Sequence, residues 1–412
     1  MKVLHTSDWH LGRSLYGQKR YTEFGRFLDW LGDTIQSEQV DTLLVAGDIF
    51  DTSAPSNRAQ SLYYQFLCRV AASACRHIIV IAGNHDSPTF LDAPRELLRS
   101  LDVHVVGATT DNINDEILLL KDADDCPELL VCAVPYLRDR DIRLVQAGES
   151  IADKDHNLLE GIRSHYHQVA ALAESQRQAL KRDIPIIAMG HLFTVGGQTI
   201  DGDGVRELYV GSLAHVNASI FPPCIDYVAL GHLHVPQKIG GSELMRYSGS
   251  PLPMGFGEAT QEKSVCLVNF TSDKAAQPHL ELLPVPVFQQ LKKVSGDWDA
   301  ISAQLGALVE SNASVWLEVI YSGDELISDL RERLEVLSED SKLLILRIQN
   351  TRLIERVLNS SHSEESLDDL SVNDVFTRCL AAHEIPEAQQ AALLHTYQQT
   401  LSSLHNDDSQ AE

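Results

Sequence analysis

Short polar motifs follow five apolar runs of this sequence, and this repeated pattern restricts the fold more than any other feature. The runs are rich in Val, Ile and Leu and alternate with helix-like stretches, as in proteins that layer strands with helices. The motifs, each with the run before it, are Asp8-Trp9-His10 after Lys2–Thr6, Gly47-Asp48 after Val40–Ala46, Gly83-Asn84-His85-Asp86 after Ile78–Ala82, Gly190-His191 after Ile184–Met189, and Gly231-His232-Leu233-His234 after Tyr227–Leu230. The sequence therefore predicts an α/β fold whose strands deliver polar side chains to one rim.

The side chains expected at this rim are of kinds that bind divalent cations. They comprise two carboxylates, one amide and four imidazoles: Asp8, His10, Asp48, Asn84, His191, His232 and His234. Nitrogen and oxygen donors without a thiolate suit Mn or Fe better than Mg, and they do not exclude zinc. The glycines before four of the motifs let the backbone turn sharply close to an ion. A single histidine after a strand is usually structural, but five motifs in register indicate a site for two divalent ions.

The net charge of −25 limits what this chain can bind by itself. Proteins that hold DNA normally do so through Lys and Arg, so either the substrate is small or a partner supplies the basic surface. The acidity is concentrated at the end, where residues 360–412 contain ten Asp or Glu and one basic residue, Arg378. Such a segment is more suited to contact a protein than a nucleic acid.

Nothing in the sequence indicates a membrane or secreted protein. The apolar runs are far shorter than the roughly 20 residues that a membrane helix needs. The first eight residues reach polar and charged side chains before a signal peptide could form its apolar core. The seven cysteines are odd in number and include no C-x-x-C pair, which fits reduced thiols. A cytoplasmic protein without membrane contact is expected.

Changes of pattern along the chain predict more than one domain. Apolar spacing around residues 156–182 predicts an amphipathic surface helix, and the polar stretch Thr271–His279 suggests the first boundary. Beyond it, a strand is expected at Val315–Tyr321, a helix at Glu325–Leu337 and a strand at Lys342–Ile348. The expected domains are residues 1–275, a small α+β domain at residues 280–352, a linker at 353–370 and a helical segment at 371–405.

The helical segment 371–405 has an apolar stripe, which predicts that it packs against another surface. Ser371-Val372-Asn373-Asp374 resembles a helix-capping box, and Pro386 suits the first turn of a second helix. In that second helix, apolar residues recur every three or four positions, at Leu394, Tyr397, Leu401 and Leu404. Two short helices bury little against each other, so docking on another protein is expected. Packing against the body of this chain is the alternative.

The motifs resemble, in order, those of the calcineurin-like metallophosphoesterases. The matching patterns are Asp8-x-His10, Gly47-Asp48-x-x-Asp51, Gly83-Asn84-His85-Asp86, Gly190-His191 and Gly231-His232-x-His234. The opening His5–Gly12, the Asp48–Asp51 segment with Pro55-Ser56, and Tyr247–Pro251 resemble more narrowly the double-strand-break repair nucleases. This resemblance covers essentially the whole chain. It implies a β-sandwich flanked by helices, a small capping domain that helps to select substrate, and a helical segment that binds an ATPase partner.

The resemblance also implies a role for each residue of the motifs. Asp8, His10, Asp48 and His234 would bind one ion, and Asp48, Asn84, His191 and His232 the other, so that Asp48 bridges them. The expected reaction is in-line attack of water on phosphorus, with both ions offsetting the charge on the phosphoryl oxygens. His85 would protonate or stabilise the leaving oxygen, and Asp51 would orient its ring. The alternative for His85 is a purely structural role. The alternative for Asp51 is that it only caps a turn.

The activity implied by the resemblance is hydrolysis of DNA with two divalent ions, expected to be Mn, in DNA repair, replication and recombination. It would comprise a 3′-to-5′ exonuclease on duplex ends and an endonuclease on single strands and hairpins. The resemblance further implies a homodimer bound to a coiled-coil ATPase, in a heterotetramer. This chain has no Gly-x-x-x-x-Gly-Lys-Ser/Thr loop, so any ATP must be bound elsewhere. Two alternatives remain open: a phosphodiesterase for small molecules, and a scaffold without catalysis.

Overall fold

The computed structural model describes residues 1–142, 151–194, 217–271, 277–323, 325, 327, 329–350, 393 and 397. The chain forms two compact units, Met1–Gln290 and Leu291–Glu412.

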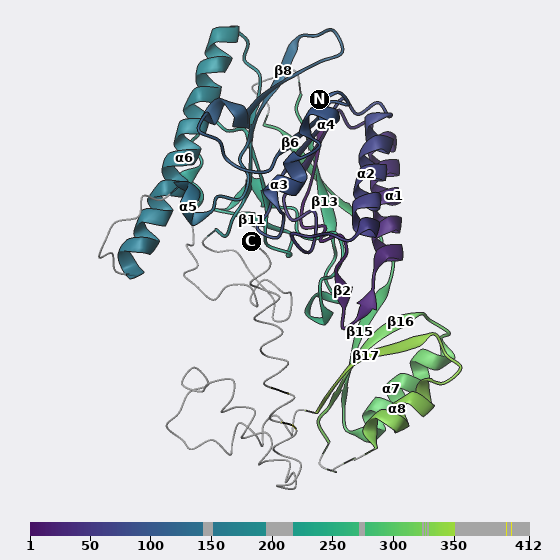
Figure 1. Ribbon diagram of the computed structural model, residues 1–412. Coiled ribbons are helices and arrows are strands. Elements are labelled where there is room, and N and C mark those ends of the chain that lie inside the picture. Colours follow the sequence, from purple (N-terminus) through teal and green to yellow (C-terminus); the bar gives the residue numbers. More distant parts are fainter. Residues whose placement is uncertain are drawn as a thin grey trace. The chain divides into compact units, whose positions relative to one another are not determined.

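Two six-stranded sheets make up the centre of the first unit (Figure 1). The strand order of the first sheet is β14 (His279–Pro284), β13 (Ser264–Asn269), β1 (Lys2–Thr6), β4 (Thr42–Ala46), β5 (His77–Ile81) and β6 (Val103–Val106). The order of the second is β11 (Gln237–Ile239), β12 (Ser242–Tyr247), β10 (Tyr227–Gly231), β9 (Ile186–His191), β8 (Pro127–Ala133) and β7 (Ile117–Lys121). The expected α/β fold is confirmed.

The strands that precede the polar motifs run parallel within each sheet. In the first sheet β1 pairs with β4, and β4 pairs with β5, in parallel register. In the second sheet β9 and β10 pair in the same way. Parallel strands end at the same edge of a sheet, so the motifs after β1, β4 and β5 emerge side by side. In the second sheet Gly190-His191 forms the end of β9 and the last motif begins at Gly231, the final residue of β10, so these two motifs also lie side by side.

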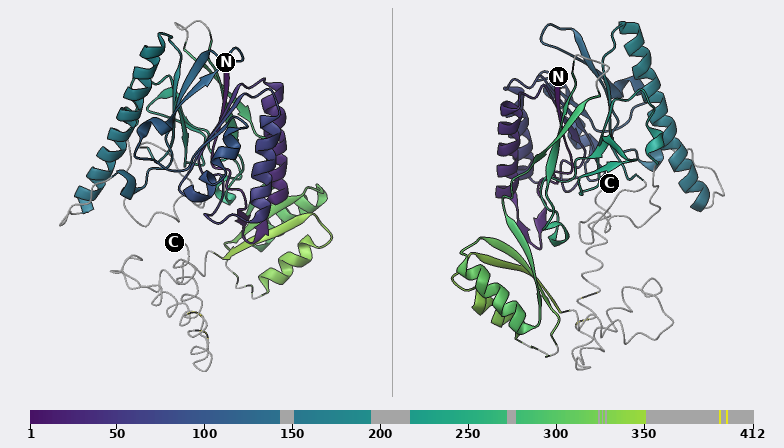
Figure 2. Two further views of the ribbon diagram at one scale, coloured as in Figure 1. Left: turned by 45° about the horizontal axis from the view of Figure 1, so that its top comes forward. Right: turned by 180° about the vertical axis from the view of Figure 1, so that it is seen from behind.

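Helices cover the two outer faces, so that the unit has four layers. Helices α1 (Tyr21–Ser37) and α2 (Asn57–Ala71) lie on the first sheet, and α6 (Ile151–Leu180) lies on the other side, against the second (Figures 1 and 2). A third apolar core fills the space between the sheets. Because both faces of the central strands are covered, strands such as β4 are apolar and buried at every position.

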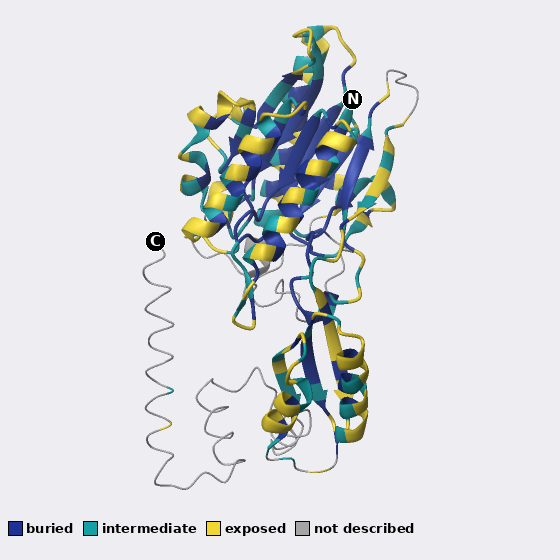
Figure 3. Ribbon diagram, turned by 90° about the vertical axis from the view of Figure 1, so that its right-hand side faces the viewer, coloured by how far each residue is buried: buried dark blue, intermediate teal, exposed yellow. Residues whose placement is uncertain are grey.

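The helices bury one face and expose the other (Figure 3). Shorter elements connect the layers. They are β2 (Ser14–Leu15), β3 (Gln18–Lys19), α3 (Pro88–Asp92), α4 (Arg95–Arg99), α5 (Asp139–Ile142), and the 3₁₀ turns η1 (Ile113–Glu116), η2 (Ala218–Ile220) and η3 (Phe256–Glu258).

The second unit is a small α+β module with its own core. Its sheet has the order β15 (Gln290–Gly296), β16 (Val315–Tyr321) and β17 (Leu343–Asn350). Helices α7 (Trp298–Glu310) and α8 (Leu330–Ser338) pack on it through buried residues such as Leu305 and Leu334. The sequence predicted a helix from Glu325, but α8 begins at Leu330, five residues later. The apolar spacing that suggested the earlier start extends beyond the helix.

The boundary region belongs to the first sheet. Strand β14 pairs with β13 over six residues, so the chain after residue 276 first completes that sheet and then enters the second unit. The division into a nuclease domain, a capping domain and a helical partner-binding segment stays a prediction. The linker at 353–370 lies outside the described residues, as does the segment 371–405 apart from Leu393 and Tyr397. Among the described helices, none combines the length and apolar character that crossing a bilayer requires.

Candidate metal centre

The loops after the strands hold four polar residues in a backbone conformation that L-amino acids rarely adopt. The φ angle is 54° at Asp8, 47° at His10, 50° at Asp48 and 106° at His232. Such a conformation costs on the order of 1–3 kcal/mol at each residue and persists only when the surroundings fix it. Here backbone hydrogen bonds do so, because the amides of Asp8 and His10 donate to the carbonyls of Gly47 and Asp48, each at 3.0 Å. Strain gathered in this way is typical of functional sites.

Two of the motif glycines are required by close approach of the neighbouring loops. A Cβ atom on Gly83 would lie 2.1 Å from Oδ1 of Asp48, and one on Gly231 would lie 1.9 Å from the carbonyl oxygen of Ala46. Any side chain at either position would push the loops apart. The glycines therefore allow residues from different strands to meet.

The first group of side chains at this edge consists of Asp8, His10 and His234. Their ligand atoms lie within 4.8 Å of one another, and all three side chains are buried. Nε2 of His10 is 3.1 Å from Nε2 of His234. The Asp8 carboxylate accepts hydrogen bonds from the His232 backbone amide and from the Ser7 hydroxyl. Strands β1 and β10, which belong to different sheets, thus deliver one group.

The second group consists of Asp48, His191 and His232, again with ligand atoms within 4.8 Å. Asn84 lies beside it. Its Oδ1 is 3.0 Å from Nε2 of His191 and 3.0 Å from Nδ1 of His232. The seven residues predicted from the strand ends therefore lie together in the structure. Which of them bind each ion stays a prediction.

Asp48, a member of the second group, also approaches the first group. Its Oδ2 is 3.3 Å from Nε2 of His191 in the second group and 3.5 Å from Nε2 of His10 in the first. A carboxylate placed in this way is a natural bridge between two divalent ions roughly 3.5–4 Å apart.

The rings are held by their outward nitrogens, as in proteins whose histidines bind metal. Nδ1 of His191 donates to the carbonyl of Ala46 at 2.9 Å. Nδ1 of His10 lies 3.5 Å from the Asp51 carboxylate, and Nδ1 of His234 lies 3.6 Å from that of Glu258. The hydrogen bond fixes the ring and tautomer of His191, and the nearby carboxylates attract Nδ1 of His10 and His234. In all three rings Nε2 faces other residues of the centre. The donor set and its orientation therefore fit two divalent cations.

The electrostatics of the buried carboxylates favour bound positive charge. Burial alone would raise the pKa of Asp48, but the adjacent His191 and His10 hold it well below its ordinary value. The same contact raises the pKa of His191 to about 9, against the effect of burial. Burial raises the pKa of Asp8, and the opposing effect of the nearby His191 and His234 is smaller. Two carboxylates so deeply buried need cations nearby, which divalent ions supply.

His85 lies at the exposed side of the centre. Its side chain is 14% exposed, whereas that of Asp48 is 2% exposed. Its Nδ1 is 2.9 Å from the backbone carbonyl of Asp51, and its Nε2 is 4.0 Å from Oδ2 of Asp48. Since a carbonyl only accepts, Nδ1 carries a hydrogen and Nε2 is left to exchange a proton.

Asp51 lies beside the rings of both His85 and His10. Its backbone carbonyl accepts from Nδ1 of His85, and its carboxylate lies within 4.8 Å of a ring nitrogen of each histidine. The carboxylate is 3.5 Å from Nδ1 of His10 and 3.3 Å from the Arg13 guanidinium. The side chain of Asp51 therefore supports a residue of the first group. The expected role of this carboxylate in orienting His85 stays a prediction.

Three supporting residues were not recognised in the sequence. The buried Asp86 carboxylate accepts from the amides of Ile49, Phe50 and Gly83, and so ties the loops after β4 and β5 together. Burial raises its pKa to about 6. Glu258 faces His234, and the buried Lys263 ammonium donates to Glu258 and to the His234 carbonyl. Asp86 stands in a quoted motif, but Glu258 and Lys263 lie outside every motif.

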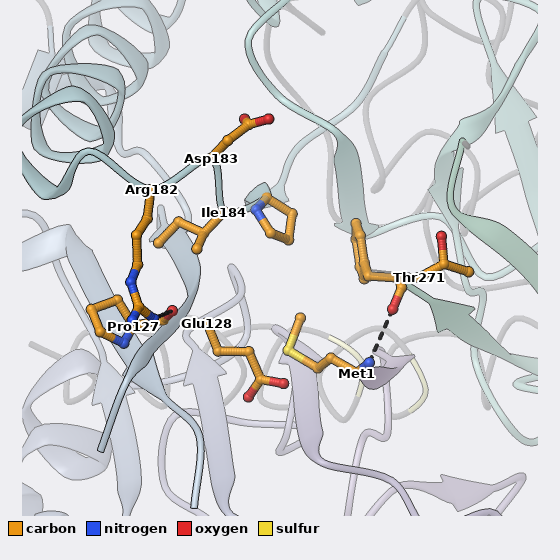
Figure 4. Close-up of a pocket in the computed structure, with 9 residues that line it drawn as sticks. Met1, Pro127, Glu128, Arg182, Asp183, Ile184 and Thr271 are labelled. Carbon is orange, nitrogen blue, oxygen red and sulfur yellow. Dashed lines mark hydrogen bonds between the residues drawn. The ribbon is translucent and has the colours of Figure 1, made fainter. Parts of the chain in front are cut away.

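A cavity elsewhere in the first unit is unrelated to this centre. It has a volume of about 510 Å³, and Figure 4 shows Met1 at its wall, donating from its amino group to the Phe270 carbonyl at 3.0 Å. Met1 precedes β1, whereas Asp8 and His10 follow it, so the cavity adjoins the opposite end of that strand. Its lining comprises Met1, Pro127, Glu128, Arg182, Asp183, Ile184, Pro185, Phe270 and Thr271, without any predicted site residue.

The fold and the strand-end centre define a phosphoesterase of the calcineurin-like class. Residues 1–236 match the family described as calcineurin-like phosphoesterase, and residues 287–384 match the family described as type 5 capsule protein repressor C-terminal domain. A solved dimetal phosphatase from Danio rerio overlaps 69% of this chain and 99% of its own, with a TM-score of 0.40 and 13% identity.

Relatives that align with most of the chain identify its family within this class. It is 40% identical over 407 residues to the Escherichia coli K12 protein named as SbcD, a subunit of the nuclease SbcCD, covering 98% of each chain. Proteins of the same name from Rhodobacter capsulatus and Bacillus subtilis are 35% and 38% identical, over 70% and 65% of this chain and 71% and 66% of their own. The chain belongs to the SbcD family of calcineurin-like phosphoesterases.

Proposed function

We propose that this chain is the nuclease subunit of a DNA-processing complex and that it hydrolyses DNA phosphodiester bonds with two divalent ions. The observation that carries the proposal is the position of Asp48, whose Oδ2 lies within 3.5 Å of a ring nitrogen from each of the two groups. Relatives that align with nearly the whole chain are named as part of the nuclease SbcCD, which supports DNA as the substrate.

In this proposal Asp8, His10, Asp48 and His234 hold one ion, and Asp48, Asn84, His191 and His232 hold the other. The ions are manganese, because imidazole, amide and carboxylate donors together suit it better than magnesium. When bound, they stabilise negative charge on the phosphoryl oxygens and make a water molecule more acidic.

The protein itself contributes geometry and a proton. Asp48 holds the two groups in a fixed relation, and the outward contacts of His10, His191 and His234 keep their rings from turning. His85 stands at the exposed side with Nδ1 on the Asp51 carbonyl. Because Nδ1 already carries a hydrogen, the ring acts as an imidazolium. Its Nε2 gives its proton to the oxygen that leaves phosphorus, which neutralises the charge as the bond breaks and leaves a neutral ring. Asp51 is a positioning residue, acting through its carbonyl on His85 and through its carboxylate on His10.

The partner in this proposal is an SbcC-like coiled-coil ATPase. The names of the relatives describe one member of a complex, and the net charge of −25 leaves this chain poorly suited to hold duplex DNA alone. We further propose a homodimer within a heterotetramer, located in the cytoplasm, with the 371–405 segment as the binding site for the ATPase. Its activities comprise 3′-to-5′ digestion of duplex ends and cleavage of single strands and hairpins.

A substrate comparison tests the proposal. The purified chain with manganese is expected to cleave single strands and hairpins, and to digest duplex ends from the 3′ side only when the ATPase and ATP are added. A small diester such as bis(p-nitrophenyl) phosphate should be hydrolysed far more slowly than DNA at equal concentration, because it lacks the remaining strand contacts. Efficient turnover of the small diester with no cleavage of any DNA would contradict the proposal, and would favour a small-molecule phosphodiesterase.

A further inference from the structure

A second cluster of metal-binding side chains lies at the other end of the first sheet. It consists of His77 at the start of β5, Asp102 just before β6, and His104 within β6. Their ligand atoms lie within 4.8 Å of one another. The proposed catalytic residues follow the carboxyl end of β5, whereas His77 begins that strand. The four residue steps from His77 to Ile81 already separate the two places by about 13 Å.

The strand register explains why these side chains converge. Ile78 is paired with Val103 and Ile79 with His104 in parallel alignment, so His77 is next to Asp102. The amide of Ile78 donates to the Asp102 carbonyl at 3.1 Å, which fixes this alignment at the end of the ladder. Residues two apart in a strand share a face, so His77 and His104 lie on one face of the sheet. Asp102 precedes the strand with a φ of 55°, and its carboxylate lies within 4.8 Å of a nitrogen of both rings. That face also carries Ile79 and Val106, which belong to the core between the sheets.

The tautomer of His77 leaves a nitrogen available for an ion. Its Nε2 lies 2.8 Å from the carbonyl of Lys121, the last residue of β7 in the second sheet. A carbonyl cannot donate, so Nε2 carries the hydrogen and Nδ1 has a lone pair. That Nδ1 is buried and has no hydrogen-bond partner within the described part of the chain. A ring with one nitrogen on a backbone carbonyl and the other bare is the usual arrangement of a metal-binding histidine.

The other two side chains suit the same role. Burial, together with the nearby His77, lowers the pKa of His104, so its ring is neutral and can donate a lone pair. Asp102 has a φ of 55° and an exposed side chain, so its carboxylate is accessible from solvent. That exposure gives an ion a route into the cluster.

The neighbouring cations are largely engaged elsewhere. Arg76 pairs with Asp41 at 2.9 Å and with Glu128 at 2.7 Å, and Lys121 pairs with Asp125 at 2.8 Å. Arg99 lies near His104, and its guanidinium is 3.7 Å from the Glu96 carboxylate. The positive charge around the cluster is therefore paired with carboxylates, which limits its repulsion of an ion.

We propose that His77, Asp102 and His104 form a peripheral site for one zinc-like divalent cation, separate from the catalytic centre. Two imidazoles and one carboxylate match the donors that zinc takes in proteins, and a water molecule completes four-fold coordination. The ion would join β5 to the edge strand β6. Through the bond from His77 to Lys121, it would also hold the edge of the second sheet.

Counting bound zinc tests this site directly. The full chain is equilibrated with micromolar zinc, freed of unbound ion, and analysed for zinc per chain by elemental analysis. The wild type is expected to bind one equivalent more than His104→Gln. His167→Gln, which alters an exposed histidine of α6, should bind as many ions as the wild type. Because the result is a difference of one equivalent between variants, it does not depend on how many ions the catalytic centre takes or on nuclease activity.

Asp102→Asn provides a second variant that the fold should tolerate. Asparagine accepts the positive φ of this exposed position, so the fold is retained while the ligand charge is lost. Zinc is expected to raise the thermal unfolding temperature of the wild type more than that of Asp102→Asn or His104→Gln. Equal zinc content and an equal zinc-dependent shift in all three proteins would overturn the proposed site.

Discussion

Replacing Asp48 with asparagine is expected to reduce phosphodiester hydrolysis by more than about 10³-fold, a loss of roughly 4 kcal/mol or more in transition-state stabilisation. Asp48 is the residue whose Oδ2 approaches a ring nitrogen of both groups, so the change removes the anionic bridge. Asparagine has the same shape and tolerates the φ of 50°, and its Oδ1 can still accept from the His85 amide. Turnover of single-stranded DNA in manganese measures the effect.

A surface carboxylate provides the matched control for this change. Asp29 lies on α1 and is 77% exposed, so Asp29→Asn should keep wild-type turnover and thermal stability. Undiminished turnover of Asp48→Asn would show that the bridging carboxylate is dispensable. It would support the alternative in which the metal centre does not take part in catalysis.

His85→Gln is expected to lower kcat by about 10²- to 10⁴-fold without changing the number of manganese ions bound. Its ring reaches the exposed side of the centre and is fixed through Nδ1, so the variant loses proton donation and keeps the seven proposed ligands. Glutamine retains polarity and similar reach, but it cannot give up a proton near neutral pH. Single-turnover cleavage together with elemental analysis separates the two quantities.

His279→Gln is the control, since His279 is exposed on β14. If His85→Gln lost manganese in proportion to activity, His85 would be a metal ligand or a structural residue rather than a proton donor. A substrate with a more acidic leaving group should lose less rate in the variant, because its oxygen leaves without protonation.

Several features of the fold could be predicted because local pattern and tertiary position agree. Strands β1 and β16 have the predicted bounds, since each is a short run dominated by residues that favour strands, such as Val and Leu. The neighbouring positions of Asp8 and Asp48 also followed from sequence, because each stands two residues after a strand of the same sheet. Parallel pairing then places such residues at one edge of a sheet. His191 is the last residue of β9 in the second sheet, and its approach to Asp48 depends on how the two sheets pack.

Other contacts left no signal in the sequence. Glu258 and Lys263 contact His234 only because the loop after β12 folds back toward this residue. No spacing of residues in the sequence indicates that path of the loop. The partner of His85 is a backbone carbonyl, which every residue has, so residue type could not distinguish it from the Asp51 side chain. The start of α8 was misplaced because helical periodicity in Leu residues does not mark where a helix begins.

Crystals of the full chain soaked in manganese give the most direct test of the central claim, that two divalent ions are held across Asp48. Anomalous-difference maps are expected to show two peaks roughly 3.5–4 Å apart. One should lie among Asp8, His10 and His234 and the other among Asn84, His191 and His232, with the Asp48 carboxylate touching both. A single peak, or none within coordination distance of Asp48, would contradict the account.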